Sequence, residues 1–74
     1  HSDDNDWRVR RKAAGSSDSE SIIRKLSKDK DYRVRGVVPY NKSTPLDIID
    51  SLQNDSNEYV RRTATSEYNL WTKK

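Results

Sequence analysis

Residues 29–35 read DKDYRVR, and two further stretches of the 74-residue chain match them. The stretch at 4–10 reads DNDWRVR and the stretch at 55–61 reads DSNEYVR, so the spacings are 25 and 26 residues. A second block repeats once, because IIRKL at 22–26 returns as IIDSL at 48–52, 26 residues later. Matches at one period across several positions indicate a repeat architecture.

We call the stretches 4–10, 29–35 and 55–61 the Asp–Arg segments. Each of them has the residue pattern of a helix start. The third residue is Asp6, Asp31 or Asn57, whose side-chain oxygen suits an N-cap. Two apolar residues four positions apart then share one helical face. We therefore expect short helices of about two turns, the first ending near a left-handed Gly15 and the second loosening at Pro39.

The IIRKL and IIDSL blocks each follow a start signal of their own. Thr44 precedes Pro45, which predicts a capping threonine with proline at the first helical position. Asp18 is expected to cap the earlier helix. The apolar stripe of each block is too narrow to form a core alone, so it needs a neighbouring repeat, as in a solenoid.

The composition fits one small domain without covalent support. Only 30% of the residues are hydrophobic, 36% are charged, and cysteine is missing altogether. Disulfides, thiolate metal sites and cysteine-held clusters are therefore excluded. No apolar run is long enough for a membrane span or a signal peptide, so no membrane association is expected. The lack of cysteine and of a leader favours the cytoplasm.

The middle repeat resembles the variant leucine-rich repeat family, a group of HEAT-like α-solenoids. The resemblance is strongest over 29–52, where a Val-Arg pair is followed by Asn41 and by Thr44-Pro45 before an apolar helix. It implies an all-α fold, a short right-handed solenoid of alternating short α and 3-10 helices with about two and a half repeats of 25–26 residues. The implied division is a disordered tail or tag remnant at 1–3, a repeat domain at 4–71 with repeats 4–28, 29–54 and 55–71, and a tail at 72–74.

Each Asp–Arg segment ends on an arginine six residues after its first aspartate. In HEAT-like arrays a ladder of this kind links turn and helix between adjacent repeats. A dedicated phosphate site would not supply its own competing anion each time, so we interpret these residues as a structural ladder rather than a phosphate site. The ladder residues are Asp4 with Arg10, Asp29 with Arg35, and Asp55 with Arg61.

The remaining basic residues favour the first half of the chain. Residues 1–37 contain ten Lys or Arg against seven acids, whereas residues 38–74 contain five of each. Basic side chains beside aromatic ones suit phosphate contact and base stacking. With a net charge of only +3, an ordinary solvated face remains the other interpretation. The candidate partner or nucleic-acid surface consists of Trp7, Arg8, Arg11, Lys12, Tyr32 and Arg33.

Two of these residues and two near the carboxyl end have structural interpretations as well. Trp7 and Tyr32 follow the N-cap directly, so each is also expected to pack at the seam between repeats. Leu70 and Trp71 are expected to close the last repeat, because the ends of a solenoid need a cap. The open alternative is that the chain belongs to a longer array, in which Trp71 faces a missing neighbour.

Nothing in the sequence indicates catalysis. The single histidine is His1, and without cysteine or an internal histidine the usual nucleophile–base pairs lack their members. We expect no enzyme activity, no cofactor and no metal. The sequence favours a non-enzymatic module that presents a helical-repeat surface to a protein partner. The alternative is a nucleic-acid-binding module that uses the basic patch of the first two repeats.

Overall fold

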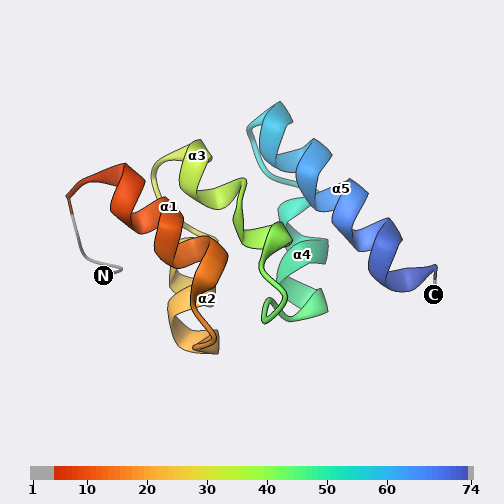
Figure 1. The fold of residues 1–74 in the computed structure, drawn as a ribbon. Helices are drawn as coiled ribbons and strands as arrows, with labels where there is room; N and C mark the ends of the chain where they lie inside the picture. Colours follow the sequence, from red (N-terminus) through yellow and green to blue (C-terminus); the bar gives the residue numbers. More distant parts are fainter. Residues whose placement is uncertain (1–4, 74) are drawn as a thin grey trace.

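The structure, a computed structural model, describes residues 5–73, and every regular element in that range is helical (Figure 1). The absence of strands there confirms the predicted all-α class. None of the described helices is long and apolar enough to cross a bilayer. In chain order the elements are α1 (Trp7–Ser16), α2 (Glu20–Leu26), α3 (Tyr32–Arg35), the 3-10 helix η1 (Val38–Tyr40), α4 (Leu46–Leu52) and α5 (Glu58–Thr72).

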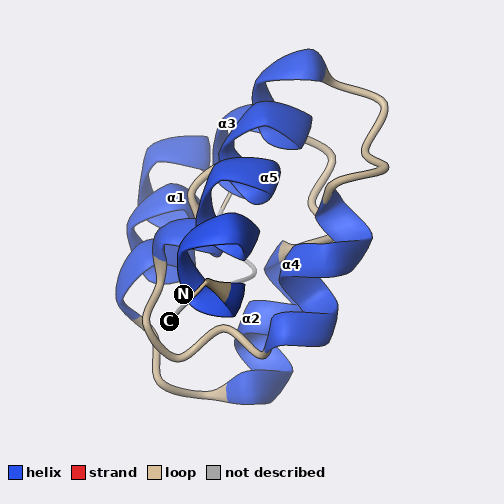
Figure 2. Cartoon of the chain, turned by 90° about the vertical axis from the view of Figure 1, so that its right-hand side faces the viewer, coloured by secondary structure: helices blue, strands red, loops and turns tan. Residues whose placement is uncertain are grey.

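The helices lie in two layers (Figure 2). Helices α1, α3 and α5, each of which starts within an Asp–Arg segment, form one layer, and α2 and α4 form the other. Within the first layer α1 packs against α3, and α3 packs against α5. Between the layers, α2 packs on α1 and α4 packs on α5. The result is a flat molecule of 36 × 24 × 14 Å.

The hydrophobic core fills the space between these layers. Most isoleucines and leucines of the second layer are buried against valines and alanines of the first, whereas Ile22 is half-buried and Leu46 is exposed. Burying one such large aliphatic side chain is worth about 1.5–3 kcal/mol, so a core this small has little margin. Its buried members are Ala14, Ile23, Leu26, Val34, Val38, Ile48, Ile49, Leu52, Val60 and Ala64.

The predicted N-caps of the first layer are confirmed. Asp6 accepts from the main-chain amide of Arg8 at 2.9 Å, and Asp31 accepts from that of Arg33 at 2.8 Å. Asn57 accepts from the amide of Tyr59 at 2.8 Å. Each cap residue is extended, so the chain enters all three helices in the same way.

Two helices are longer than the sequence predicts. Helix α1 ends at Ser16, near Gly15 as predicted, but it has 10 residues and no described glycine has a positive φ, so the left-handed conformation predicted for Gly15 is wrong. Helix α5 has 15 residues rather than two turns, and it includes Thr72, which the predicted division places in the tail at 72–74. It runs on because no glycine or proline interrupts residues 58–72.

Both predicted caps in the second layer are wrong. The N-cap of α2 is Ser19 rather than Asp18. The hydroxyl of Thr44 is buried and donates to the carbonyl of Val38 at 2.6 Å, and α4 begins directly after Pro45 without a side-chain cap. Pro39 lies in η1, beyond the end of α3, which agrees with the predicted loosening there.

A buried asparagine ties the loop after η1 to the end of α1. The side-chain amide of Asn41 donates to the carbonyls of Ala14 at 2.9 Å and Ser17 at 2.8 Å. Its Oδ1 accepts from the amide of Ser43 at 2.9 Å. The side chain is thus satisfied on both sides, and it provides polar partners for the open carboxyl end of a helix.

Replacing Asn41 tests this tie. We expect Asn41→Ala to lower the free energy of unfolding by about 1–3 kcal/mol, since two carbonyls lose a buried donor. The exposed neighbour Lys42 is the control, and Lys42→Ala should change stability by less than about 0.5 kcal/mol. Urea unfolding followed by far-ultraviolet circular dichroism measures both. Equal midpoints for the two variants would contradict the assignment.

Candidate interaction surface

Two buried ion pairs join consecutive Asp–Arg segments. Arg10 Nε lies 2.8 Å from Asp29 Oδ2, and its Nη2 lies 3.3 Å from Oδ1. Arg35 Nε lies 2.8 Å from Asp55 Oδ1, and its Nη2 lies 3.1 Å from Oδ2. None of the four side chains is more than 15% exposed. Each arginine therefore makes a two-pronged contact with a carboxylate 19 or 20 residues further along the chain.

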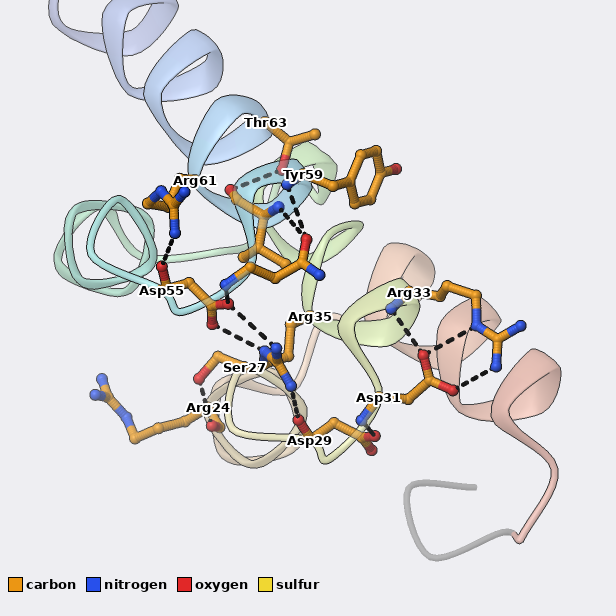
Figure 3. A network of polar contacts seen from close by, with 12 residues as sticks. Arg24, Ser27, Asp29, Asp31, Arg33, Arg35, Asp55, Tyr59, Arg61 and Thr63 are labelled. Carbon is orange, nitrogen blue, oxygen red and sulfur yellow. Dashed lines mark hydrogen bonds and ion pairs between the residues drawn. The ribbon is translucent and has the colours of Figure 1, made fainter.

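The six-residue spacing seen in the sequence corresponds to a different contact. Arg35 Nη1 donates to the main-chain carbonyl of Asp29 at 2.6 Å, and Arg61 Nη1 donates to that of Asp55 at 2.9 Å (Figure 3). The side-chain carboxylate of Asp29 belongs to Arg10 instead, so the expected pairing within one segment is corrected to pairing with the next. Asp4, the first predicted ladder residue, lies outside the described residues.

Tight turns orient the two buried carboxylates. Asp29 Oδ1 accepts from the amide of Asp31 at 2.9 Å, and Asp55 Oδ2 accepts from the amide of Asn57 at 2.8 Å (Figure 3). The residue that donates is in both cases the N-cap of the following helix. In each case a single Asx turn both orients the aspartate of the ion pair and leads into the next helix. Both oxygens of the buried carboxylate accept hydrogen bonds.

A stacked pair, Trp7 and Arg33, lies at the centre of a surface cluster, in which Trp7 is half-buried against the core and Arg33 is exposed. The guanidinium of Arg33 lies 3.6 Å from the centroid of the Trp7 ring, and that of Arg11 lies 5.2 Å from it. Arg33 is held in place by Asp31, whose oxygens accept from Nε at 3.0 Å and Nη2 at 2.8 Å (Figure 3). A cation over an indole face is the most favourable form of this contact.

Tyr59 extends the cluster onto α5. Its ring meets the ring of Tyr32 edge-on, with centroids 6.1 Å apart and planes at 81°. Gly36 leaves room for it, because a Cβ at that position would collide with the Tyr59 ring. A hollow of about 360 Å³ lies here and is lined by Arg11, Tyr32, Arg33, Val37 and Tyr59. We call Trp7, Arg11, Tyr32, Arg33 and Tyr59 the aromatic–arginine surface.

Four of the six predicted surface residues belong to this cluster, and two do not. Arg8 is paired with Asp6 at 3.1 Å, and its side chain is 70% exposed. Lys12 is exposed on α1 and is not part of the hollow's lining. Sequence comparison missed Tyr59, because the third segment has Glu58 at the aromatic position and its tyrosine comes one residue later.

The ion pairs at the helix starts reduce the charge of this face. The Arg33 side chain, by hydrogen bonding, holds the pKa of Asp31 at about 2, and Arg8 likewise lowers the pKa of Asp6. Asp31 in turn raises the pKa of Arg33. Among the described residues, Arg11 and Lys12 have no carboxylate within ion-pair distance, so they carry the uncompensated charge of this face.

The described residues contain no group of three acidic or histidine side chains that could hold a metal ion. Comparison with known proteins finds no matching family model, no similar curated protein and no similar solved structure.

Removing one buried guanidinium should strongly lower the stability of the fold. Arg35→Ala leaves Asp55 buried without its partner, so we expect a loss of about 3–5 kcal/mol in the free energy of unfolding. Arg24 is also paired with carboxylates but is 46% exposed, and Arg24→Ala should cost less than about 1 kcal/mol. Urea unfolding compares them. Similar losses for both variants would show that burial of the pair has no special role.

Acid should weaken the start of α3. Asp31 has a pKa of about 2 in the folded chain against an ordinary value of 3.8. The stabilisation is therefore complete above pH 4 and is lost as the pH falls towards 2. Asp31→Asn keeps the capping oxygen but cannot titrate. We expect the urea midpoint of the wild type to exceed that of Asp31→Asn near neutral pH, with the gap closing in acid. A gap that is constant with pH would contradict the assignment.

Proposed function

We propose that the chain is a non-enzymatic interaction module that binds a protein partner through the aromatic–arginine surface. The Trp7–Arg33 stack is the observation that carries this proposal. Tryptophan, tyrosine and arginine are the residue types concentrated at the energetic centres of protein interfaces. Asp31 holds the Arg33 side chain in place before any partner arrives, which reduces the entropy lost on binding, and Gly36 leaves room for the Tyr59 ring.

The chemistry of the surface indicates an acidic and aromatic segment as the partner. Arg11 of the surface attracts carboxylates, and so does Lys12, the next residue along α1 outside the surface, since no acid among the described residues pairs with either. The hollow between Tyr32, Val37 and Tyr59 suits one apolar side chain. A short segment with an aromatic or aliphatic anchor next to Asp or Glu matches both features.

The architecture that we propose around this surface is a right-handed solenoid of the variant leucine-rich repeat type. Three Asp–Arg segments at spacings of 25 and 26 residues start the three helices of one layer. The same two-pronged ion pair occurs between the first and second of these helices and again between the second and third. A repeat array of this type requires a contact that recurs between each repeat and the next, as this ion pair does.

Nucleic acid is a weaker candidate for the same surface. Arg8 and Arg33, two of the four predicted phosphate ligands, each already hold a carboxylate. A phosphate would have to displace that carboxylate, and the affinity of such surfaces comes mainly from uncompensated cations.

Peptide selection tests the proposal. Random peptides selected on the full chain should be enriched in acidic residues beside an aromatic or aliphatic one. In ¹⁵N–¹H spectra the selected peptides should shift the signals of Tyr32, Arg33 and Tyr59. Arg33→Ala should weaken binding about 10-fold or more, as expected for an interface hot spot. Arg24→Ala is the matched control, because that arginine is also carboxylate-paired and similarly exposed but lies on α2.

The same spectra with nucleic acid decide between the two candidates. A short duplex and a short single strand should leave the surface signals unchanged. If instead they shift these signals, and the affinity falls several-hundred-fold between about 50 and 200 mM salt, the surface binds phosphate and the protein-binding proposal is wrong.

A further inference from the structure

We propose that the partner segment of the aromatic–arginine surface is an extended chain that continues past Tyr59 into a second hollow and places a tyrosine side chain there. This proposal rests on the proposed function. It adds to that function the conformation of the partner segment, the identity of its second anchor and the spacing of its two anchors.

The second hollow lies between η1 and α5. It has a volume of about 650 Å³ and is lined by Tyr40, Glu58, Tyr59, Arg62, Thr63 and Ser66. Tyr59 also lines the first hollow, the one of about 360 Å³, so the two hollows meet at its side chain. Val37 lines the first hollow, and Tyr40, three residues later in the chain, lines the second. The same stretch of chain therefore borders both hollows, and a segment bound in the first has a direct path into the second.

The repeat pattern of the sequence continues through both hollows. Arg33 and Tyr59 occupy the same position of their Asp–Arg segments, and Arg11 and Arg62 each follow the last arginine of theirs. Arg11 and Arg33 line the first hollow, and Tyr59 and Arg62 line the second. The two hollows thus follow the first layer of helices from α1 to α5. An extended chain advances about 3.3 Å per residue against 1.5 Å for a helix, so it crosses these helices with the fewest residues.

Gly36 fixes the position of Tyr59 between the hollows. Its φ of −69° and ψ of −19° are ordinary right-handed values that any residue adopts. The backbone therefore does not require glycine here. A Cβ would collide with the Tyr59 ring, which lies against Gly36 and meets Tyr32 edge-on. Gly36 is thus a positioning residue of the surface, since it acts through Tyr59.

The chemistry of the second hollow suits a tyrosine. Tyr40 and Tyr59 are both exposed and offer two rings to an aromatic side chain. Arg62 Nη1 lies 3.8 Å from Glu58 Oε2, which is too long for a hydrogen bond, and both side chains are exposed. A phenol hydroxyl donates to a carboxylate and accepts from a guanidinium, so it satisfies both groups. A carboxylate in the same place would be repelled by Glu58.

The size of the Tyr59 ring sets the spacing of the two anchors. Side chains that pack against an aromatic ring lie about 4.5–7 Å from its centroid, so anchors on either side of Tyr59 are about 9–14 Å apart. At about 3.3 Å per residue, an extended chain covers this distance in about three or four residues. We therefore expect the tyrosine three or four residues from the anchor that fills the first hollow.

Peptides selected on the full chain test the second anchor. They should contain a tyrosine at this spacing, and in ¹⁵N–¹H spectra they should shift the signals of Tyr40 and Arg62 as well as those of the first hollow. Tyr40→Ala should weaken binding about 10-fold or more. Trp71→Ala is the matched control, because that aromatic residue is also exposed but lines neither hollow.

A double-mutant cycle shows whether Tyr40 and the peptide tyrosine meet. Replacing the peptide tyrosine by alanine should weaken binding to the wild type about as much as Tyr40→Ala does. On the Tyr40→Ala chain the same peptide change should have little further effect, because both changes remove one contact. Losses that simply multiply would overturn the assignment of the tyrosine to this hollow.

Gly36→Ala tests the position of Tyr59. We expect it to weaken binding about 10-fold or more without lowering the urea midpoint, because alanine is favoured over glycine in this conformation. On a Tyr59→Ala chain the same substitution should leave binding unchanged. An equal loss in both backgrounds would contradict a role that acts through the Tyr59 ring.

The two proposals fail in different ways. If the selected peptides depend on Arg33 but have no tyrosine at this spacing, and Tyr40→Ala binds them like the wild type, the second hollow is not part of the site and the proposed function stands. If no peptide is selected, or Arg33→Ala binds as tightly as the wild type, both proposals are wrong.

Discussion

The ion pair between Arg10 and Asp29 exposes less than a tenth of either side chain, in a chain with only 30% hydrophobic residues. A buried charge is costly unless it is paired and fully hydrogen-bonded. Here the Asx turn fixes the carboxylate, and the guanidinium meets it with two nitrogens. The two nearly parallel hydrogen bonds favour a narrow range of relative positions of the two groups, and the pair thus links the two segments that start α1 and α3.

The same turn also shapes the surface. Asp29 holds the amide of Asp31, and Asp31 caps α3 and grips the side chain of Arg33. Arg33 is thereby laid over Trp7 of the neighbouring helix. Two contacts thus depend on this one turn. Asp29 holds the buried pair with Arg10, and Asp31, two residues later, positions Arg33 on Trp7. The buried pair and the exposed stack are therefore linked through the local geometry of the turn rather than through the core.

Sequence reasoning succeeded where the signal is local and failed where a distant group decides. The N-caps Asp6, Asp31 and Asn57 act on amides two residues away, so the pattern was sufficient to find them. The hydroxyl of Thr44 instead donates to the carbonyl of Val38, which lies close to it only in the folded chain. The aromatic cluster was found only in part, since Tyr59 reaches it from a shifted position and fits because Gly36 lacks a side chain.

Whether the surface suits a protein or a nucleic-acid partner depends on how much of its positive charge is already neutralised by carboxylates. The net charge of +3 comes from 15 basic residues against 12 acidic ones, so most cations have an available anion. Several of these carboxylates form ion pairs with arginines of the Asp–Arg segments. The aromatic–arginine surface therefore has little net positive charge but a well-defined geometry. The Arg33 guanidinium lies over the Trp7 indole, and two tyrosines lie beside them. These features support the proposed protein partner over a nucleic acid, because protein partners are recognised by fit and a few directed contacts, whereas a phosphate backbone is held chiefly by charge.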